Sequence, residues 1–106
     1  MKQYIQQNKD RFFEELFSIL RIPSISAKKE HKADMLKCAN RLVELLKQAG
    51  ADQAAVYPTA GNPVVFGKKT VSPNAKTVMV YGHYDVMPVD PLSLWKSKPF
   101  EPEIRT

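Results

Sequence analysis

Apolar side chains recur every three or four positions along the first fifty residues, and this spacing predicts two amphipathic helices. The first predicted helix covers residues 3–20. It ends before Pro23, because the residue that precedes a proline is pushed out of the helical region. Its apolar face is formed by Phe13, Leu16, Phe17 and Leu20.

The second predicted helix begins near Lys29, after a short linker that contains Ser24, Ile25 and Ser26. It ends at Gly50, where a left-handed glycine cap is expected after the last apolar position. Its apolar face is formed by Leu36, Ala39, Val43, Leu46 and Ala49.

After Gly50 the period shortens, and three strands are predicted at residues 53–57, 64–67 and 77–81. The third segment is apolar with almost no alternation, which is typical of an interior strand that is buried on both faces. Beyond Asp85 the chain is rich in proline, so we expect an ordered loop there rather than a central strand or a long helix.

This order of elements predicts an α/β fold in which two N-terminal helices pack on the first strands of a mixed sheet. The chain has 106 residues, which suits one compact domain and excludes two. Because the sequence stops in the proline-rich loop without a closing helix, we expect residues 1–106 to be an incomplete domain whose sheet receives further strands from elsewhere.

The formal net charge of +5 lies mostly in the first fifty residues, where no run of adjacent lysines and arginines follows one face. This distribution is typical of a solvated surface, so neither a nucleic acid nor a membrane is an expected partner. No apolar segment approaches the roughly 20 residues that a membrane span needs, and the N-terminus is charged from its start. We therefore expect a cytoplasmic protein.

The only cysteine is Cys38, which excludes an internal disulfide and suits a reducing compartment. It lies inside the second predicted helix, between Lys37 and Ala39. We interpret it as a small packing residue rather than a nucleophile.

The candidate chemistry lies just past the third predicted strand, where His83 and Asp85 are two positions apart. In extended backbone, such residues point to the same side and can serve one pocket. A neutral imidazole can bind Zn²⁺ through one nitrogen while a carboxylate accepts the proton of the other. Spacing alone is a weak signal, because one histidine and one aspartate do not complete a zinc site. His31, among charged residues, is expected to be a solvated surface residue.

The wider sequence around this pair resembles a signature of carnosinase-like dipeptidases. The resemblance is carried by YGHYDVMPVDP at residues 81–91, LW at 94–95 and PFEP at 99–102. RIPSIS at residues 21–26 is also similar to that family. These dipeptidases belong to a metallopeptidase superfamily that includes aminoacylases, succinyl-diaminopimelate desuccinylase and bacterial glutamate carboxypeptidases.

The resemblance implies the N-terminal part of a zinc-peptidase catalytic domain, without the family's smaller lid domain. It implies a parent enzyme that hydrolyses short peptides with two zinc ions, with His83 as a zinc ligand and Asp85 as the catalytic-site carboxylate that orients it. This chain alone would hold at most one weak partial zinc site and would be inactive. The resemblance allows a homodimeric parent.

Two alternatives stay open. The parent could be an N-acyl amino acid deacylase or a desuccinylase of the same superfamily, because the residues that discriminate these substrates are absent from this chain. The chain could also be a catalytically inactive interaction module, in which His83 would have no companion ligands.

Overall fold

The computed structural model describes residues 1–105 and opens with two helices in place of the one predicted over residues 3–20. Helix α1 spans Lys2–Gln7 and helix α2 spans Lys9–Leu20. They are divided at Asn8, whose φ of −110° and ψ of 11° leave the helical region. The Asn8 side-chain amide donates to the carbonyl of Tyr4 at 2.9 Å, and such local bonds compete with helix continuation.

The second predicted helix is confirmed as α3, Lys32–Gln48, preceded by a 3₁₀ turn over Lys29–His31. Gly50 follows with a φ of +89°, in the left-handed region that was predicted for a glycine cap. Its backbone N–H donates to the carbonyl of Lys47 at 2.9 Å, which satisfies one of the last carbonyls of the helix. Within residues 1–105, no helix combines the length and the apolar content that crossing a membrane would require.

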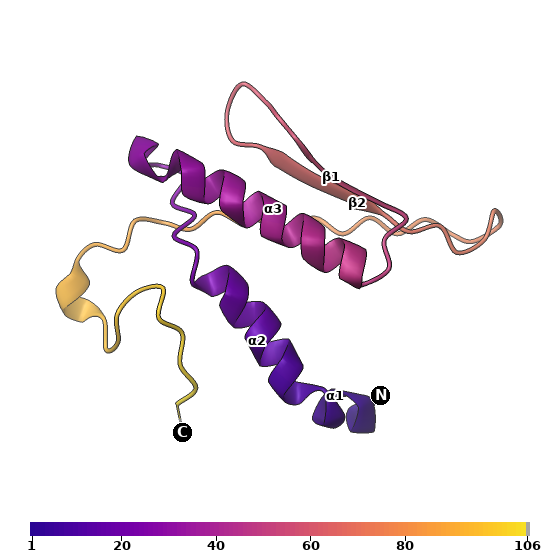
Figure 1. Ribbon diagram of the computed structural model, residues 1–106, viewed down its shortest axis with the longest axis horizontal. Helices are drawn as coiled ribbons and strands as arrows, with labels where there is room; N and C mark the ends of the chain where they lie inside the picture. Colours follow the sequence, from indigo (N-terminus) through magenta and orange to yellow (C-terminus); the bar gives the residue numbers. More distant parts are fainter. Residues whose placement is uncertain (106) are drawn as a thin grey trace.

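Strands β1, Gln53–Tyr57, and β2, Val64–Lys68, form an antiparallel hairpin in which Ala55 lies opposite Phe66. Helix α3 lies between α2 and this hairpin (Figure 1) and packs on both strands. A glycine at position 67 allows the close approach, because a Cβ there would come within 2.9 Å of Leu46 Cδ1. The predicted α/β class is confirmed, but the described sheet is a two-stranded antiparallel hairpin rather than a mixed sheet, and α2 packs on α3.

The prediction of an interior strand over residues 77–81 is wrong for the part of the chain that the structure describes. These residues form no strand ladder, and the side chains of Val78, Met79 and Val80 are 82%, 88% and 91% exposed. Burial on both faces requires paired strands at the edges and layers above and below. The hairpin and α3 do not provide them, because β2 pairs only with β1 in the described sheet.

The core lies where the linker after α2 crosses the first turns of α3. Cys38 and Ala39 of α3 are fully buried, so the expectation that Cys38 is a packing residue is confirmed. The remaining buried residues are Ile22, Ser24, Ile25 and Met35. Half of these buried residues therefore belong to the linker between α2 and α3. The core consequently lies beside the segment that carries His83 and Asp85.

Candidate metal-binding site

The extended segment that carries His83 and Asp85 is tied to the linker between α2 and α3. Val86 forms an isolated parallel β-bridge with Ile25, and the Val86 N–H donates to the carbonyl of Ser24 at 2.9 Å. The Ser24 hydroxyl donates to the carbonyl of Tyr84 at 2.7 Å. Because Ser24 and Ile25 are each only 2% exposed, this junction anchors residues 84–86 to the core.

The side chains of His83 and Asp85 contact each other. His83 Nδ1 lies 3.2 Å from Asp85 Oδ1, so an Nδ1–H group can donate a hydrogen bond to the carboxylate. The intervening Tyr84 points elsewhere, and its hydroxyl donates to the carbonyl of Pro63 in the loop between β1 and β2. The alternation expected of extended backbone therefore holds across these three residues.

Asp85 has a second partner that the sequence did not predict. The hydroxyl of Ser26 donates to Asp85 Oδ2 at 2.6 Å. This hydrogen bond lowers the pKa of the Asp85 carboxyl below its usual value, partial burial opposes the shift, and the contact with His83 adds to it. Ser26 lies 59 positions from Asp85, so no local spacing could have indicated the contact.

The remaining ring nitrogen of His83 faces outward. Its Nε2 lies 3.2 Å from the hydroxyl of Tyr81, whose ring stands edge-on to the imidazole at 5.4 Å between centroids. The His83 side chain is 71% exposed. Because a carboxylate can only accept, the pairing with Asp85 places the proton on Nδ1 and leaves Nε2 as an acceptor. Nε2 is therefore the atom that could bind a metal.

The donor set fits one metal ligand with its supporting carboxylate. Across residues 1–105 no group of three or more His, Cys, Asp and Glu side chains is placed to hold a metal ion. His31 lies elsewhere, at the start of α3, where its Nδ1 is 2.7 Å from Asp34 Oδ2. The sequence predicts a solvated surface residue at this position, but His31 is half-buried against Asp34. A complete zinc site, which needs at least three protein ligands, would require residues outside those described.

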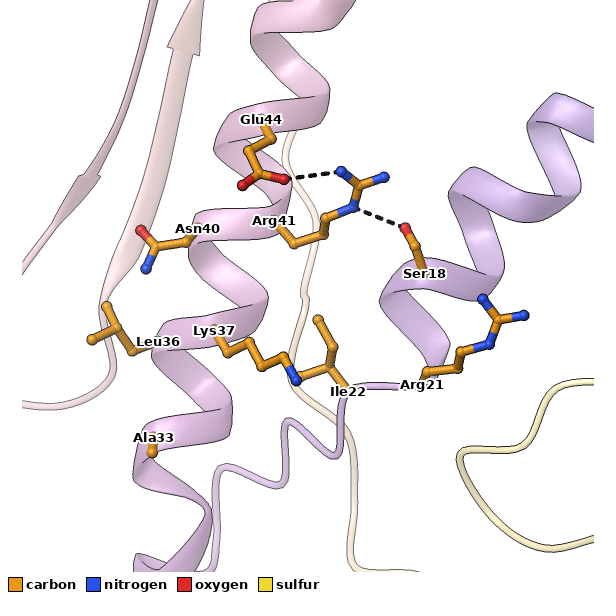
Figure 2. A pocket seen from close by; sticks show the side chains of 9 residues that line it. All are labelled: Ser18, Arg21, Ile22, Ala33, Leu36, Lys37, Asn40, Arg41 and Glu44. Carbon is orange, nitrogen blue, oxygen red and sulfur yellow. Dashed lines mark hydrogen bonds and ion pairs between the residues drawn. The ribbon is translucent and has the colours of Figure 1, made fainter.

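Two hollows lie near the site without including His83 or Asp85. One, of about 610 Å³, lies between α2 and α3 (Figure 2). Its two arginines already have partners: Arg41 contacts Glu44 and Ser18, and Arg21 pairs with Glu14 at 2.6 Å. The other is an apolar groove of about 920 Å³ between the end of α2 and the loop of residues 86–105. The hollows therefore add no group to the metal-binding pair.

Comparisons with known proteins identify relatives of this chain. No family model matches the chain. The Cys-Gly metallodipeptidase DUG1 of Candida albicans is 32% identical over 91% of this chain and 22% of its own length. The namesake enzyme of Saccharomyces cerevisiae is 30% identical over 93% of this chain and 23% of its own length.

A solved structure gives the same result in three dimensions. The structure of the dipeptidase Dug1p from Saccharomyces cerevisiae, described as showing its substrate recognition, matches with a TM-score of 0.83 and 29% identity. The match covers 92% of this chain and 23% of that chain. This chain thus spans less than a quarter of the length of the relatives it matches, and over that stretch it is homologous to the Cys-Gly metallodipeptidases.

Proposed function

We propose that this chain is the N-terminal part of the catalytic domain of a metal-dependent dipeptidase. The observation that carries the proposal is the pairing of His83 Nδ1 with Asp85 at 3.2 Å. This pair lies inside the YGHYDVMPVDP segment that carries the family resemblance. The homology to Cys-Gly metallodipeptidases supports the same reaction class.

Within this proposal, His83 is a zinc ligand through Nε2, and Asp85 holds the ring in the required tautomer and orientation. A bound zinc ion would lower the pKa of a water molecule and polarise the scissile carbonyl. The resemblance implies that the other ligands, a second zinc ion and the general base belong to sequence that this chain does not include. The 106-residue chain alone should therefore be inactive.

The proposed substrates are dipeptides, with Cys-Gly as the first compound to test because the curated relatives are named for it. These names favour a dipeptidase over a deacylase or a desuccinylase. The proposal also includes a cytoplasmic location and a homodimeric parent enzyme, both of which rest on the sequence and on the family resemblance alone.

The test is hydrolysis of Cys-Gly by the full-length protein that contains this chain. We expect release of cysteine and glycine that stops when a chelator is added and resumes when zinc is restored. His83→Ala should reduce kcat/KM by more than the roughly 10–100-fold that loss of a supporting hydrogen bond to a ligand costs. His31→Ala is the matched control, because His31 pairs with Asp34 away from the site and should retain activity.

Hydrolysis that continues in excess chelator would reject the metal-dependent mechanism. Full activity of His83→Ala beside active His31→Ala would reject the ligand assignment while leaving the reaction class intact. A full-length protein that cleaves N-acyl amino acids but not Cys-Gly would favour the deacylase.

A further inference from the structure

We infer that Ser26 is a positioning residue for the His83–Asp85 pair, because its hydroxyl fixes the carboxylate that orients the imidazole. The inference rests on the proposed function for its relevance to metal binding. The two hydrogen bonds that support it, from Ser26 to Asp85 and between His83 and Asp85, lie within this chain and do not depend on a bound metal.

The first step is how the two oxygens of Asp85 are used. Oδ2 accepts from the Ser26 hydroxyl at 2.6 Å, and Oδ1 lies 3.2 Å from His83 Nδ1. The terminal torsion of an aspartate is broad, so a carboxylate held at one oxygen alone can rotate. Occupation of the second oxygen by Ser26 removes this freedom and keeps Oδ1 directed at the imidazole.

The second step is how Ser26 is held. Its neighbour Ile25 is 2% exposed and forms the β-bridge with Val86, next to Asp85 in sequence. The carbonyl of Ile25 accepts from the Lys28 N–H at 3.3 Å, which closes a turn around Ser26. The hydroxyl is therefore placed by backbone that packs into the core and is already joined to the segment it serves.

The third step links this hold to the metal-binding atom. A carboxylate that stays oriented keeps the proton on His83 Nδ1 and the lone pair on Nε2. Hydrogen bonds to a charged acceptor are stronger than neutral ones, so the 2.6 Å contact from Ser26 is suited to this role. Without the hydroxyl, the side-chain carboxylate of Asp85 should rotate more freely, and His83 should populate both neutral tautomers.

The test compares Ser26→Ala with Ser26→Thr, which retains a hydroxyl, and with Ser93→Ala as a control at an exposed position. The first readout is the ¹⁵N NMR of the His83 ring nitrogens in the metal-free 106-residue chain, at a pH where the imidazole is neutral. We expect wild type to show a protonated Nδ1 and an unprotonated Nε2. Ser26→Ala should shift toward a mixture of tautomers, and Ser26→Thr should restore the wild-type pattern.

The second readout is zinc affinity of the full-length protein, measured by competition with a chromophoric chelator. Ser26→Ala should weaken zinc binding by about 10-fold, at the lower end of the range for residues that support a ligand. Ser26→Thr and Ser93→Ala should bind as wild type does. If Ser26→Ala lowers the melting temperature, Ser26→Cys replaces it, because a thiol fills the space but is a weak donor.

Ring-nitrogen shifts that are the same in Ser26→Ala and wild type would overturn the inference. A Thr variant that fails to restore what the Ala variant loses would also overturn it, because the effect would then not come from the hydroxyl. If wild type and all variants fail to bind zinc, the proposed function is rejected, and the NMR comparison still decides whether Ser26 holds the pair.

Discussion

Hydrogen bonds around the His83 ring form a short chain in which each group has a defined role. The Tyr81 hydroxyl faces Nε2, Nδ1 faces Asp85, and the other oxygen of Asp85 accepts from Ser26. The direction of each bond follows from the ionised carboxylate, which can only accept. At the scale of single residues, the site is therefore a pre-oriented imidazole with one nitrogen free for a ligand once the phenol moves aside.

Asp85→Asn tests the carboxylate in this chain. The amide oxygen can still accept from Nδ1, so the fold should persist, but the negative charge that attracts the Nδ1 proton and orients the ring is lost. We expect zinc affinity or kcat/KM of the full-length protein to fall by roughly 10–100-fold. Asp90→Asn is the control, because Asp90 is exposed and contacts only Lys28 among the described ion pairs, at 3.4 Å. Equal losses in both variants would contradict a specific role for Asp85.

The sequence was sufficient to bring His83 and Asp85 together, since residues two apart in extended backbone share a side. It was not sufficient to find Ser26, because that contact depends on how the linker crosses the segment after residue 83. Tyr81 and His83 are also two positions apart, so the contact between the Tyr81 hydroxyl and His83 Nε2 could have been inferred from the same alternation.

At the scale of elements, local signals located the ends of helices well. Pro23 ended the first helical region and Gly50 capped α3, because both residues restrict or permit backbone angles directly. Asn8 divided the first helix through a side-chain bond to Tyr4, a signal that the apolar spacing did not contain. Residues 77–81 have the composition of a strand but no strand partner among the described residues. Strand formation depends on pairing with segments that are distant in the sequence, which local composition does not reveal.

Asp52 joins the start of the hairpin to the segment after β2. Its carboxylate accepts from the Thr70 N–H at 2.6 Å and from Lys69 Nζ at 3.2 Å, and these bonds lower the pKa of the Asp52 carboxyl. A lowered folded-state pKa means that the stabilisation is present above the usual aspartate pKa and is lost as the pH falls through the folded value.

Asp52→Asn should therefore lower the melting temperature at pH 7, and the difference from wild type should shrink as the pH falls below about 4. Thermal unfolding followed by circular dichroism at several pH values measures this difference. A difference that stays constant into strong acid would show that the charge of Asp52 is not responsible.

At the scale of the whole molecule, the described chain is flat and open. Its radius of gyration is 16.3 Å, and its extents are 53 × 42 × 19 Å. A compact domain of this length would have a radius of gyration of about 13 Å. The buried core is correspondingly small and centres on α3 and the linker, with Cys38 among the fully buried side chains.

Cys38 offers a direct probe of this core. Burial raises the pKa of its thiol, which keeps the reactive thiolate scarce near neutral pH. We expect a thiol reagent to label the native chain on the order of 10–100-fold more slowly than the chain in denaturant. Equal labelling rates in the two conditions would mean that the core around α3 opens freely in solution.

The bridge between Ile25 and Val86 also has a consequence for how the site forms. It joins residues about sixty positions apart, so the chain between them, which includes α3 and the hairpin, must be closed into a loop before His83, Asp85 and Ser26 can meet. Closing such a loop costs entropy that only the finished core repays. The contact of Ser26 with the His83–Asp85 pair should therefore form late in folding, and its loss should accompany cooperative unfolding of α3 rather than local fraying of one segment.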